Sequence, residues 1–145
     1  MDVRFARIDD DRLAEKAPTH WREKAAKMRF DRGRRQELAV GGLLVEMTGI
    51  VEPAIVLDEN GKPSFRDHPE LHFSLSHSGD YVMCAISDSP IGCDIEKDAP
   101  LDEDVKKEVG SIAEWTLKEA AFKCGKRAEA RLVSAPAGYF AAVAY

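Results

Sequence analysis

The sequence predicts a single domain, residues 1–145, that mixes helices and strands. Three short strand patterns follow one another between Leu71 and Lys97, and helical patterns flank this stretch on both sides. No linker, repeat or low-complexity tract divides the chain. A hydrophobic fraction of 44% with 32% charged residues is typical of a globular domain that encloses a core.

The first half of the chain begins with a strand pattern and continues as helix. Val3–Ile8 alternates apolar and polar residues and predicts the first strand. Thr19 is expected to cap a helix that begins near Trp21. Arg34–Met47 has its apolar residues at helical spacing, and Gly49 is placed to end that helix.

Two features of this half depend on glycine. Gly41 and Gly42 weaken the helix that contains them, which favours close packing or a bound group beside it. Ile55–Leu57 is a short strand pattern, and Asp58–Pro63 follows as a turn with Asn-Gly at its centre. Lys62 is expected at the tip of this turn with a free ammonium group, either as a solubilising charge or as a ligand-binding one.

The central stretch predicts three strands. Leu71–Leu75 alternates, so a strand there has one apolar face and one polar face. The polar run Ser76–Asp80 is expected to break it as a turn. Tyr81–Ile86 is almost entirely apolar and predicts a central strand covered on both faces, and Ile91–Glu96 is the third strand.

Two carboxylates on this third strand suggest chemistry. Asp94 and Glu96 are two residues apart, so they share one face of the strand while Cys93 and Ile95 take the other. Like charges at this separation repel and favour a cation, for which Mg2+ or Mn2+ with oxygen ligands is the natural candidate. The alternative is a solvated strand end, with Glu96 paired to a lysine at the surface.

The last part returns to helix and closes on a strand. Val105–Cys124 has helical periodicity with two apolar stripes, one of Ile112, Trp115 and Phe122 and one of Leu117, Ala120, Ala121 and Cys124. Glu119 falls along the first stripe, where an unpaired carboxylate is costly. Lys123 one turn on can pair with it, or a metal shared with Asp94 and Glu96 can hold it. Tyr139–Tyr145 predicts the last strand.

Charge and cysteine content exclude several classes of function. A net charge of −5 argues against broad nucleic-acid binding. The segment 22–35 nevertheless concentrates basic residues, which suits a small phosphorylated ligand or an acidic partner, or is simply a solvated helix face. The three cysteines, Cys84, Cys93 and Cys124, are expected to be reduced packing residues. Without a signal-like or membrane-spanning segment, a cytoplasmic protein with no membrane partner is expected.

Four segments in order resemble the 4'-phosphopantetheinyl transferases of the Sfp type. They are Gly61-Lys62-Pro63, Phe73–Ser78 (FSLSHS), Ile91–Lys97 (IGCDIEK) and Trp115–Lys123 (WTLKEAAFK). The resemblance implies an α+β fold of that family, with antiparallel strands, packed helices and two pseudo-two-fold halves. The chain between Glu96 and Trp115 is shorter than is usual for the family, which implies a truncated second half.

The resemblance also implies the activity and its participants. The family transfers the 4'-phosphopantetheine arm of coenzyme A to a serine of an acyl or peptidyl carrier protein, with Mg2+, and releases 3',5'-ADP. The positions that match the family's motifs are Asp94, Glu96 and Glu119 as metal ligands; Glu119 and Lys123 as catalytic residues; and Lys24, Lys27, Gly61, Lys62, Pro63, Ser76, His77, Lys118 and Lys123 around coenzyme A. Without the resemblance, His77 is better explained as a turn histidine that bonds nearby backbone.

The shortened segment 97–114 leaves one alternative open. A family member with altered carrier docking could be a non-catalytic homologue that binds coenzyme A or a carrier protein. The sequence does not identify the carrier or the oligomeric state, and it does not separate Mg2+ from Mn2+.

Overall fold

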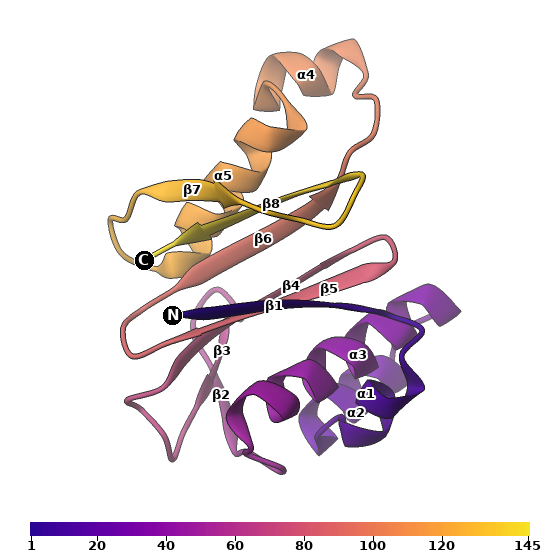
Figure 1. The fold of residues 1–145 in the computed structure, drawn as a ribbon, viewed down its shortest axis with the longest axis vertical. Helices are drawn as coiled ribbons and strands as arrows, with labels where there is room; N and C mark the ends of the chain where they lie inside the picture. Colours follow the sequence, from indigo (N-terminus) through magenta and orange to yellow (C-terminus); the bar gives the residue numbers. More distant parts are fainter.

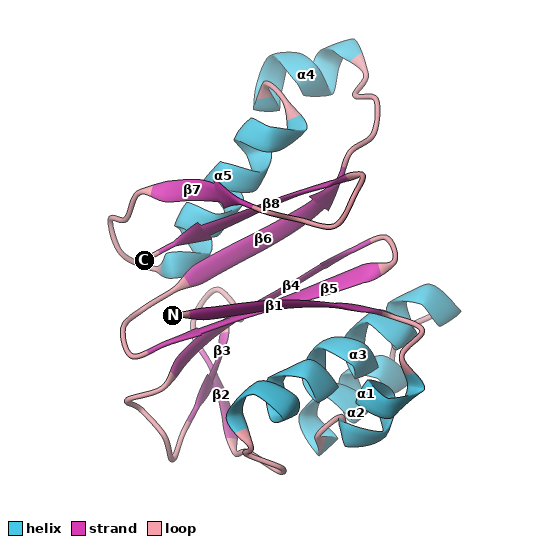
Figure 2. Ribbon diagram, in the orientation of Figure 1, coloured by secondary structure: helices cyan, strands magenta, loops and turns pink.

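The computed structural model describes residues 1–145 as two three-stranded antiparallel sheets, a short hairpin and five helices (Figures 1 and 2). The elements in chain order are β1 (Asp2–Arg7), α1 (Asp11–Lys16), α2 (Thr19–Ala26), α3 (Asp31–Thr48), β2 (Ile55–Leu57), β3 (Pro63–Phe65), β4 (His72–Ser78), β5 (Tyr81–Ser87), β6 (Gly92–Lys97), α4 (Glu103–Val109), α5 (Ile112–Cys124), β7 (Ala130–Val133) and β8 (Tyr139–Ala144). The predicted mixture of helices and strands is confirmed.

The elements form four layers, seen from bottom to top in Figure 1 as helices α1–α3, the sheet β1-β5-β4, the sheet β6-β8-β7 and helix α5. The central strand β5 shows why the layers hold together. Val82 and Cys84 point into the core shared with α3, whereas Met83 and Ala85 point into the core shared with the second sheet. The predicted central strand with both faces covered is therefore confirmed.

The glycine pair in α3 serves close helix packing. A Cβ atom on Gly42 would overlap the backbone carbonyl of Leu13 in α1, and one on Gly41 would press into the Trp21 ring of α2. The missing side chains let three helices approach one another around a core of buried apolar residues. Gly49 ends α3 in the left-handed conformation, at φ 73°, as predicted.

Helix α5 lies equally close to the second sheet. A Cβ atom on Gly92 at the start of β6 would overlap the Ala120 carbonyl and the backbone between Lys123 and Cys124. Ala120 and Cys124 pack against Ala142 and Ala144 of β8, all four of them buried. Small side chains on both surfaces therefore bring the α5 backbone within reach of the side chains on the same face of β6.

Serine side chains join the two sheets. β4 and β6 lie side by side, and the hydroxyls of Ser74, Ser76 and Ser78 accept hydrogen bonds from the backbone N–H groups of Cys93, Ile95 and Lys97 at 3.0, 3.1 and 2.9 Å. The offset is 19 residues each time, so the two strands run in the same direction. The serines stand in for the backbone acceptors of an ordinary ladder and satisfy the edge of β6.

This contact between β4 and β6, called the seam below, corrects one expectation about where β4 ends. The sequence predicts a turn at Ser76–Asp80, but β4 continues to Ser78 and only Gly79, at φ 56°, and Asp80 make the turn. The hydroxyls of Ser76 and Ser78 bond across to β6, so they do not compete with their own strand as turn residues do.

Two further expectations about helices are wrong, and three short elements lie where none was predicted. Thr19 does not cap α2, because Pro18 holds the cap position without a side-chain bond. The predicted helix 105–124 is two helices, because Gly110, at φ 80°, ends α4 and Ser111 starts α5 with a capping box to Glu114. The short elements α1, β3 and β7 were not expected, since none is long enough to show a period in the sequence.

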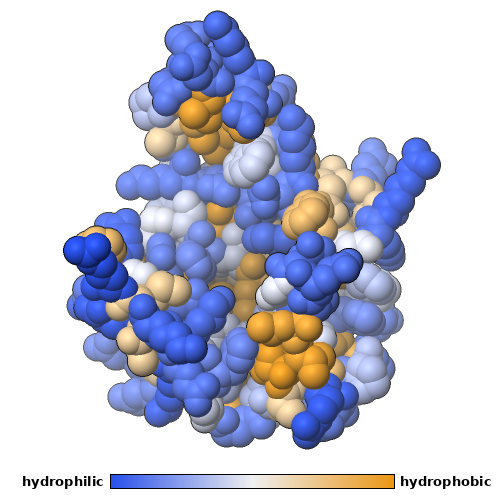
Figure 3. Space-filling model, turned by 180° about the vertical axis from the view of Figure 1, so that it is seen from behind, coloured by the Kyte–Doolittle hydropathy of each residue, from blue (hydrophilic) through white to orange (hydrophobic).

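The surface is largely hydrophilic. Figure 3 shows the face opposite to that of Figure 1, where separate apolar areas lie within hydrophilic surroundings. The predicted stripe of Ile112, Trp115 and Phe122 is not buried, since Phe122 is 65% exposed and Trp115 36%. All three cysteines are free and buried, as expected. No helix has both the length and the apolar character that crossing a membrane requires.

Candidate active site

Asp94 lies at the centre of the site, on the face of β6 that looks toward α5. The residue is 3% exposed, and its Oδ1 accepts hydrogen bonds from the Ser76 hydroxyl and the Lys123 ammonium, each at 3.1 Å. Its Oδ2 is buried and has no hydrogen-bond partner. A buried carboxylate oxygen without a partner is costly, so this atom is placed to receive a cation.

Glu96 follows on the same face of β6 and lies close to the negative charges of Asp94 and Glu119. Burial, and after it the negative charge of Asp94, raise the pKa of Glu96 to about 7, although the positive charge of Lys123 opposes the rise. Glu119 adds a smaller repulsion. The predicted shared face of Asp94 and Glu96 is thus confirmed, and a positive charge beside them would favour the ionised form of Glu96.

These carboxylates fit a hard divalent cation without forming a finished site. No group of three or more His, Cys, Asp or Glu side chains is arranged to hold a metal ion. Mg2+ commonly takes one or two protein carboxylates and completes its shell with water and substrate phosphate. The free Oδ2 of Asp94 and the neighbouring Glu96 match that donor set.

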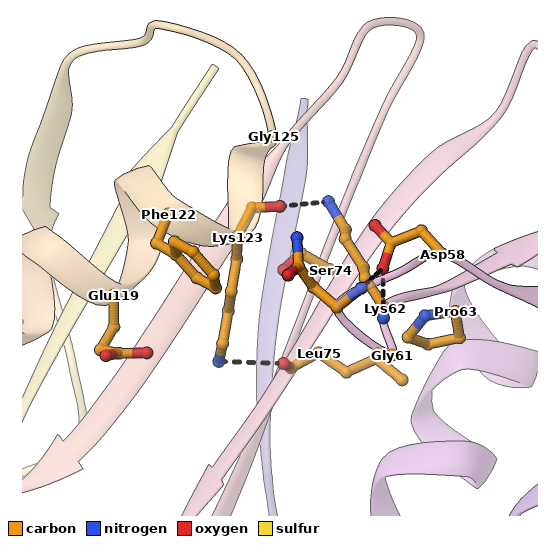
Figure 4. A pocket seen from close by; sticks show the side chains of 11 residues that line it. Asp58, Gly61, Lys62, Pro63, Ser74, Leu75, Glu119, Phe122, Lys123 and Gly125 are labelled. Carbon is orange, nitrogen blue, oxygen red and sulfur yellow. Dashed lines mark hydrogen bonds between the residues drawn. The ribbon is translucent and has the colours of Figure 1, made fainter.

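Two lysines connect the sides of the cleft (Figure 4). Lys123 of α5 donates to Asp94 and, at 3.4 Å, to the carbonyl of Leu75 in β4. Lys62 of the β2–β3 turn donates from Nζ to the carbonyls of Lys123 and Ile91, each at 2.6 Å. The expectation of a free ammonium group on Lys62 is therefore wrong, because the turn folds back over the end of α5. Burial lowers the pKa of this lysine.

The cleft between these lysines has a volume of about 250 Å³. Helix α5 contributes one side and the β2–β3 turn the other, with β4 between them (Figure 4). Its lining residues are Asp58, Asn60, Gly61, Lys62, Pro63, Ser74, Leu75, Glu119, Phe122, Lys123 and Gly125. Only two of these are hydrophobic, so the cleft suits a polar or charged ligand group.

A second cavity of about 230 Å³ adjoins the first at Gly61 and Pro63, which line both. Helix α2 supplies its basic lining, Lys24 and Lys27. The imidazole of His20 and the ring of Trp21 also face it, and Leu57 closes it from β2. The two cavities together extend from the basic end of α2 to Glu119 of α5, whereas Asp94 and Glu96 of β6 line neither of them.

The structure brings most predicted site residues to these two cavities, but not all. Gly61, Lys62, Pro63, Glu119 and Lys123 line the first, and Lys24 and Lys27 line the second. Asp94, Glu96 and Ser76 line neither cavity, and Ser76, which is 7% exposed, donates its hydroxyl to Asp94. His77 contacts Glu37 of α3 at 3.5 Å, and Lys118 is exposed on α5 and lines neither cavity.

Sequence reasoning missed one charged residue near the site. Glu37 is 3% exposed and lies between Lys24 and His77, with its carboxylate oxygens 3.6 Å and 3.5 Å from their nitrogens. The signal was available: Glu37 is one turn before Gly41 and two turns before Leu44, so it falls on the buried face of α3. A glutamate at such a position needs positive partners.

Comparisons with known proteins relate this chain to 4'-phosphopantetheinyl transferases. A 4'-phosphopantetheinyl transferase of Bacillus subtilis is 30% identical over 127 residues, which cover 83% of this chain and 56% of that protein. The transferase Sfp of Bacillus subtilis (strain 168) is 45% identical over 58 residues, or 40% of this chain and 26% of Sfp. AcpT of Escherichia coli (strain K12) is 37% identical over 98 residues, or 66% of this chain and 45% of AcpT.

The matched region therefore spans about half or less of the length of each of these relatives. No protein-family model matches the chain.

Proposed function

Because the chain belongs to the 4'-phosphopantetheinyl transferase superfamily, we propose that it transfers the 4'-phosphopantetheine arm of coenzyme A to a serine of an acyl or peptidyl carrier protein. The observation that carries this proposal is the buried Asp94, which holds Lys123 with one oxygen and keeps the other free beside a polar cleft. This pairing of a cation-binding carboxylate with a lysine suits a pyrophosphate ligand.

In the proposed reaction the serine oxygen forms a bond to the phosphorus next to pantetheine. The bond from that phosphorus to the bridging oxygen breaks, and 3',5'-ADP leaves with the bonding electrons. The serine proton passes to Glu119, which lines the cleft and has no hydrogen bond or ion pair of its own in the structure. Lys123 holds its ammonium where negative charge grows on the leaving phosphate.

Bound Mg2+, or Mn2+, would neutralise the pyrophosphate, held by Asp94 and Glu96 with Glu119 as a third ligand. Ser76 contributes by holding Asp94: its hydroxyl donates to Asp94 while accepting the N–H of Ile95. The side chain is buried, so we assign it to orienting this carboxylate in place of direct contact with the ligand.

We place the nucleotide of coenzyme A along the second cavity. Gly61 and Pro63 border the adenylate at the point where the two cavities meet, and Lys24 and Lys27 line the cavity on the side of its ribose. Lys118 stays a predicted contact of the coenzyme A phosphates from the surface of α5. The free cysteines suit a reducing compartment, so we place the reaction in the cytoplasm.

A second function is favoured by one observation. Asp94 and Lys123 already form an ion pair, and the three acidic residues do not make a ready metal cluster. A non-catalytic homologue that binds coenzyme A or a carrier protein would need the polar cleft and its lysines but no bound metal.

Intact-mass spectrometry separates the two functions. A panel of apo carrier proteins is incubated with the protein, coenzyme A and Mg2+, with Asp94→Asn as the control variant. A mass gain of one phosphopantetheine arm, absent with the variant, supports the transferase and identifies a carrier class. Calorimetric binding of coenzyme A with no gain on any carrier supports the binding protein, and absence of both rejects the two proposals together.

A further inference from the structure

Glu37 bridges two basic side chains, one of which, Lys24, lines the second cavity. It projects from α3, and its Oε2 lies 3.6 Å from Lys24 Nζ of α2 while its Oε1 lies 3.5 Å from His77 Nε2 of β4. The side chain of Glu37 is 4% exposed, against 54% for Lys24 and 39% for His77. The carboxylate is therefore fixed in the protein, whereas its two partners reach toward solvent.

The charge on Glu37 persists at neutral pH. Burial by itself raises the pKa of this carboxyl, but the hydrogen bond with His77 and the charge of Lys24 outweigh burial and leave the pKa below its ordinary value. The position between Lys24 and His77, where an incoming anion would gain most, is thus already taken by an anion that cannot swing into solvent.

We propose that Glu37 is a specificity-determining residue that disfavours a phosphate group between Lys24 and His77. This inference rests on the proposed function and refines its substrate. The nucleotide that fits best carries no phosphate on its ribose, so 3'-dephospho-coenzyme A binds at least as well as coenzyme A. With that substrate the same phosphorus–oxygen bond breaks, and the leaving group is adenosine 5'-monophosphate.

Electrostatics favours this over the opposite role for Glu37. A carboxylate can also orient two cations so that they grip a phosphate together. Here, however, each oxygen of the carboxylate already faces one of the two cations, so a phosphate at that point would meet the carboxylate charge directly. Lys27 lines the same cavity and forms no ion pair, but Glu23 lines it too, so the positive charge of Lys27 does not remove the repulsion that a dianionic phosphate meets.

Calorimetric titration with the two ligands, in the presence of Mg2+, tests the inference. The wild-type protein is expected to bind 3'-dephospho-coenzyme A as tightly as coenzyme A or more tightly, a measurement that needs no variant. Glu37→Gln is expected to tighten coenzyme A by roughly tenfold, about 1.4 kcal/mol, and to leave the dephospho ligand within about twofold.

Glu46→Gln is the matched control. Glu46 also lies on α3 and also bridges two basic side chains, Arg12 and Lys16, but away from both cavities. Its removal changes the net charge equally and is expected to leave the ratio of the two affinities unchanged.

Two results would overturn the inference. Wild-type preference for coenzyme A by tenfold or more is one, and a weaker grip on coenzyme A in Glu37→Gln is the other, since it would show that Glu37 aligns the cations for phosphate. If neither ligand binds the wild-type protein, the proposed function itself fails. If both bind and the variant changes nothing, only the role of Glu37 fails.

Discussion

The protein buries two carboxylates, Glu37 and Asp94, in two regions, and the partners of their oxygens differ. At the corner of α2, α3 and β4, each oxygen of Glu37 faces a basic nitrogen. At the seam of β4 and β6, one oxygen of Asp94 takes Ser76 and Lys123 while the other takes nothing. The first region has its charge balanced by the fold, and the second has a deficit of positive charge.

This difference separates a structural or selective role from a chemical one. Buried charge is normally paired, because leaving it unpaired costs several kcal/mol. One carboxylate oxygen without a partner, beside a second carboxylate of raised pKa, leaves negative charge that a bound cation would balance. The predictions below test whether the two regions really differ in this way.

The largest expected effect is on catalysis at the seam. Asp94→Asn keeps the size of the side chain but removes the charge that faces the free position and Lys123. We expect the rate of carrier modification to fall by about a hundredfold or more, since charge stabilisation is the main contribution to phosphoryl transfer. The rate is measured with saturating coenzyme A and Mg2+. Glu37→Gln, assayed alongside, is expected to change it by less than tenfold, and an equal loss in both would erase the comparison.

The next effect is on stability in the presence of metal. If the seam lacks a cation, Mg2+ at ten times its dissociation constant should stabilise the fold by about 1.4 kcal/mol, or a few degrees in Tm. A chelator should reverse the gain. Thermal unfolding of Asp94→Asn with and without Mg2+ provides the control, and the same rise in that variant would place the cation elsewhere.

Lys62 provides the corresponding test for a half-buried positive charge. Its ammonium is half-buried but pairs with two backbone carbonyls and no carboxylate. Lys62→Met leaves the carbonyls of Ile91 and Lys123 without this donor, so we expect a loss of about 2 kcal/mol in the free energy of unfolding. Chemical denaturation measures it. The exposed Lys107 of α4, changed to Met, is expected to alter stability by less than about 0.5 kcal/mol.

The same substitution also tests the link to the site. Because Lys62 holds the end of α5 that carries Lys123, its loss should raise KM for coenzyme A together with the loss of stability. A stability loss with unchanged KM would limit Lys62 to a structural role.

The sequence predicted the parts of this site that depend on local pattern. Period-two alternation placed Asp94 and Glu96 on one face of a strand, and helical spacing placed Glu119 and Lys123 one turn apart on the opposing helix. The strand β5 was equally clear, because a continuous apolar run leaves no polar face. The family resemblance added order and roles, which periodicity alone does not supply.

The remainder depends on contacts between distant segments. Nothing near Ser76 in the sequence indicates that its hydroxyl accepts the N–H of Ile95, nor does the turn 58–63 indicate that Lys62 folds onto the end of α5. Trp115 and Phe122 have the spacing of a buried stripe and yet lie exposed, because α5 turns its small residues toward the sheet. A helical period shows that residues share a face but not which face is covered.

The smallest expected effect is on the pH dependence of stability, where the two regions should have opposite signs. In the presence of a chelator, folded Glu96 keeps its proton to about pH 7, whereas the unfolded chain releases it near the ordinary pKa of 4.5. The folded state then binds more protons between these values, so the free energy of unfolding falls as pH rises, by about 1 kcal/mol once solvent screening is allowed for.

Glu37 should behave in the reverse way. Its pKa is below the ordinary 4.5 in the folded state, so its stabilisation is present above that pH and is lost as pH falls through the folded value. Urea unfolding across pH 3 to 8 measures both slopes. Glu96→Gln is expected to flatten the fall between about pH 4.5 and 7, and Glu37→Gln to flatten the loss in acid. A wild-type stability that rises between pH 4.5 and 7 without metal would mean that the negative charge at the seam is balanced within the fold, as it is at the corner.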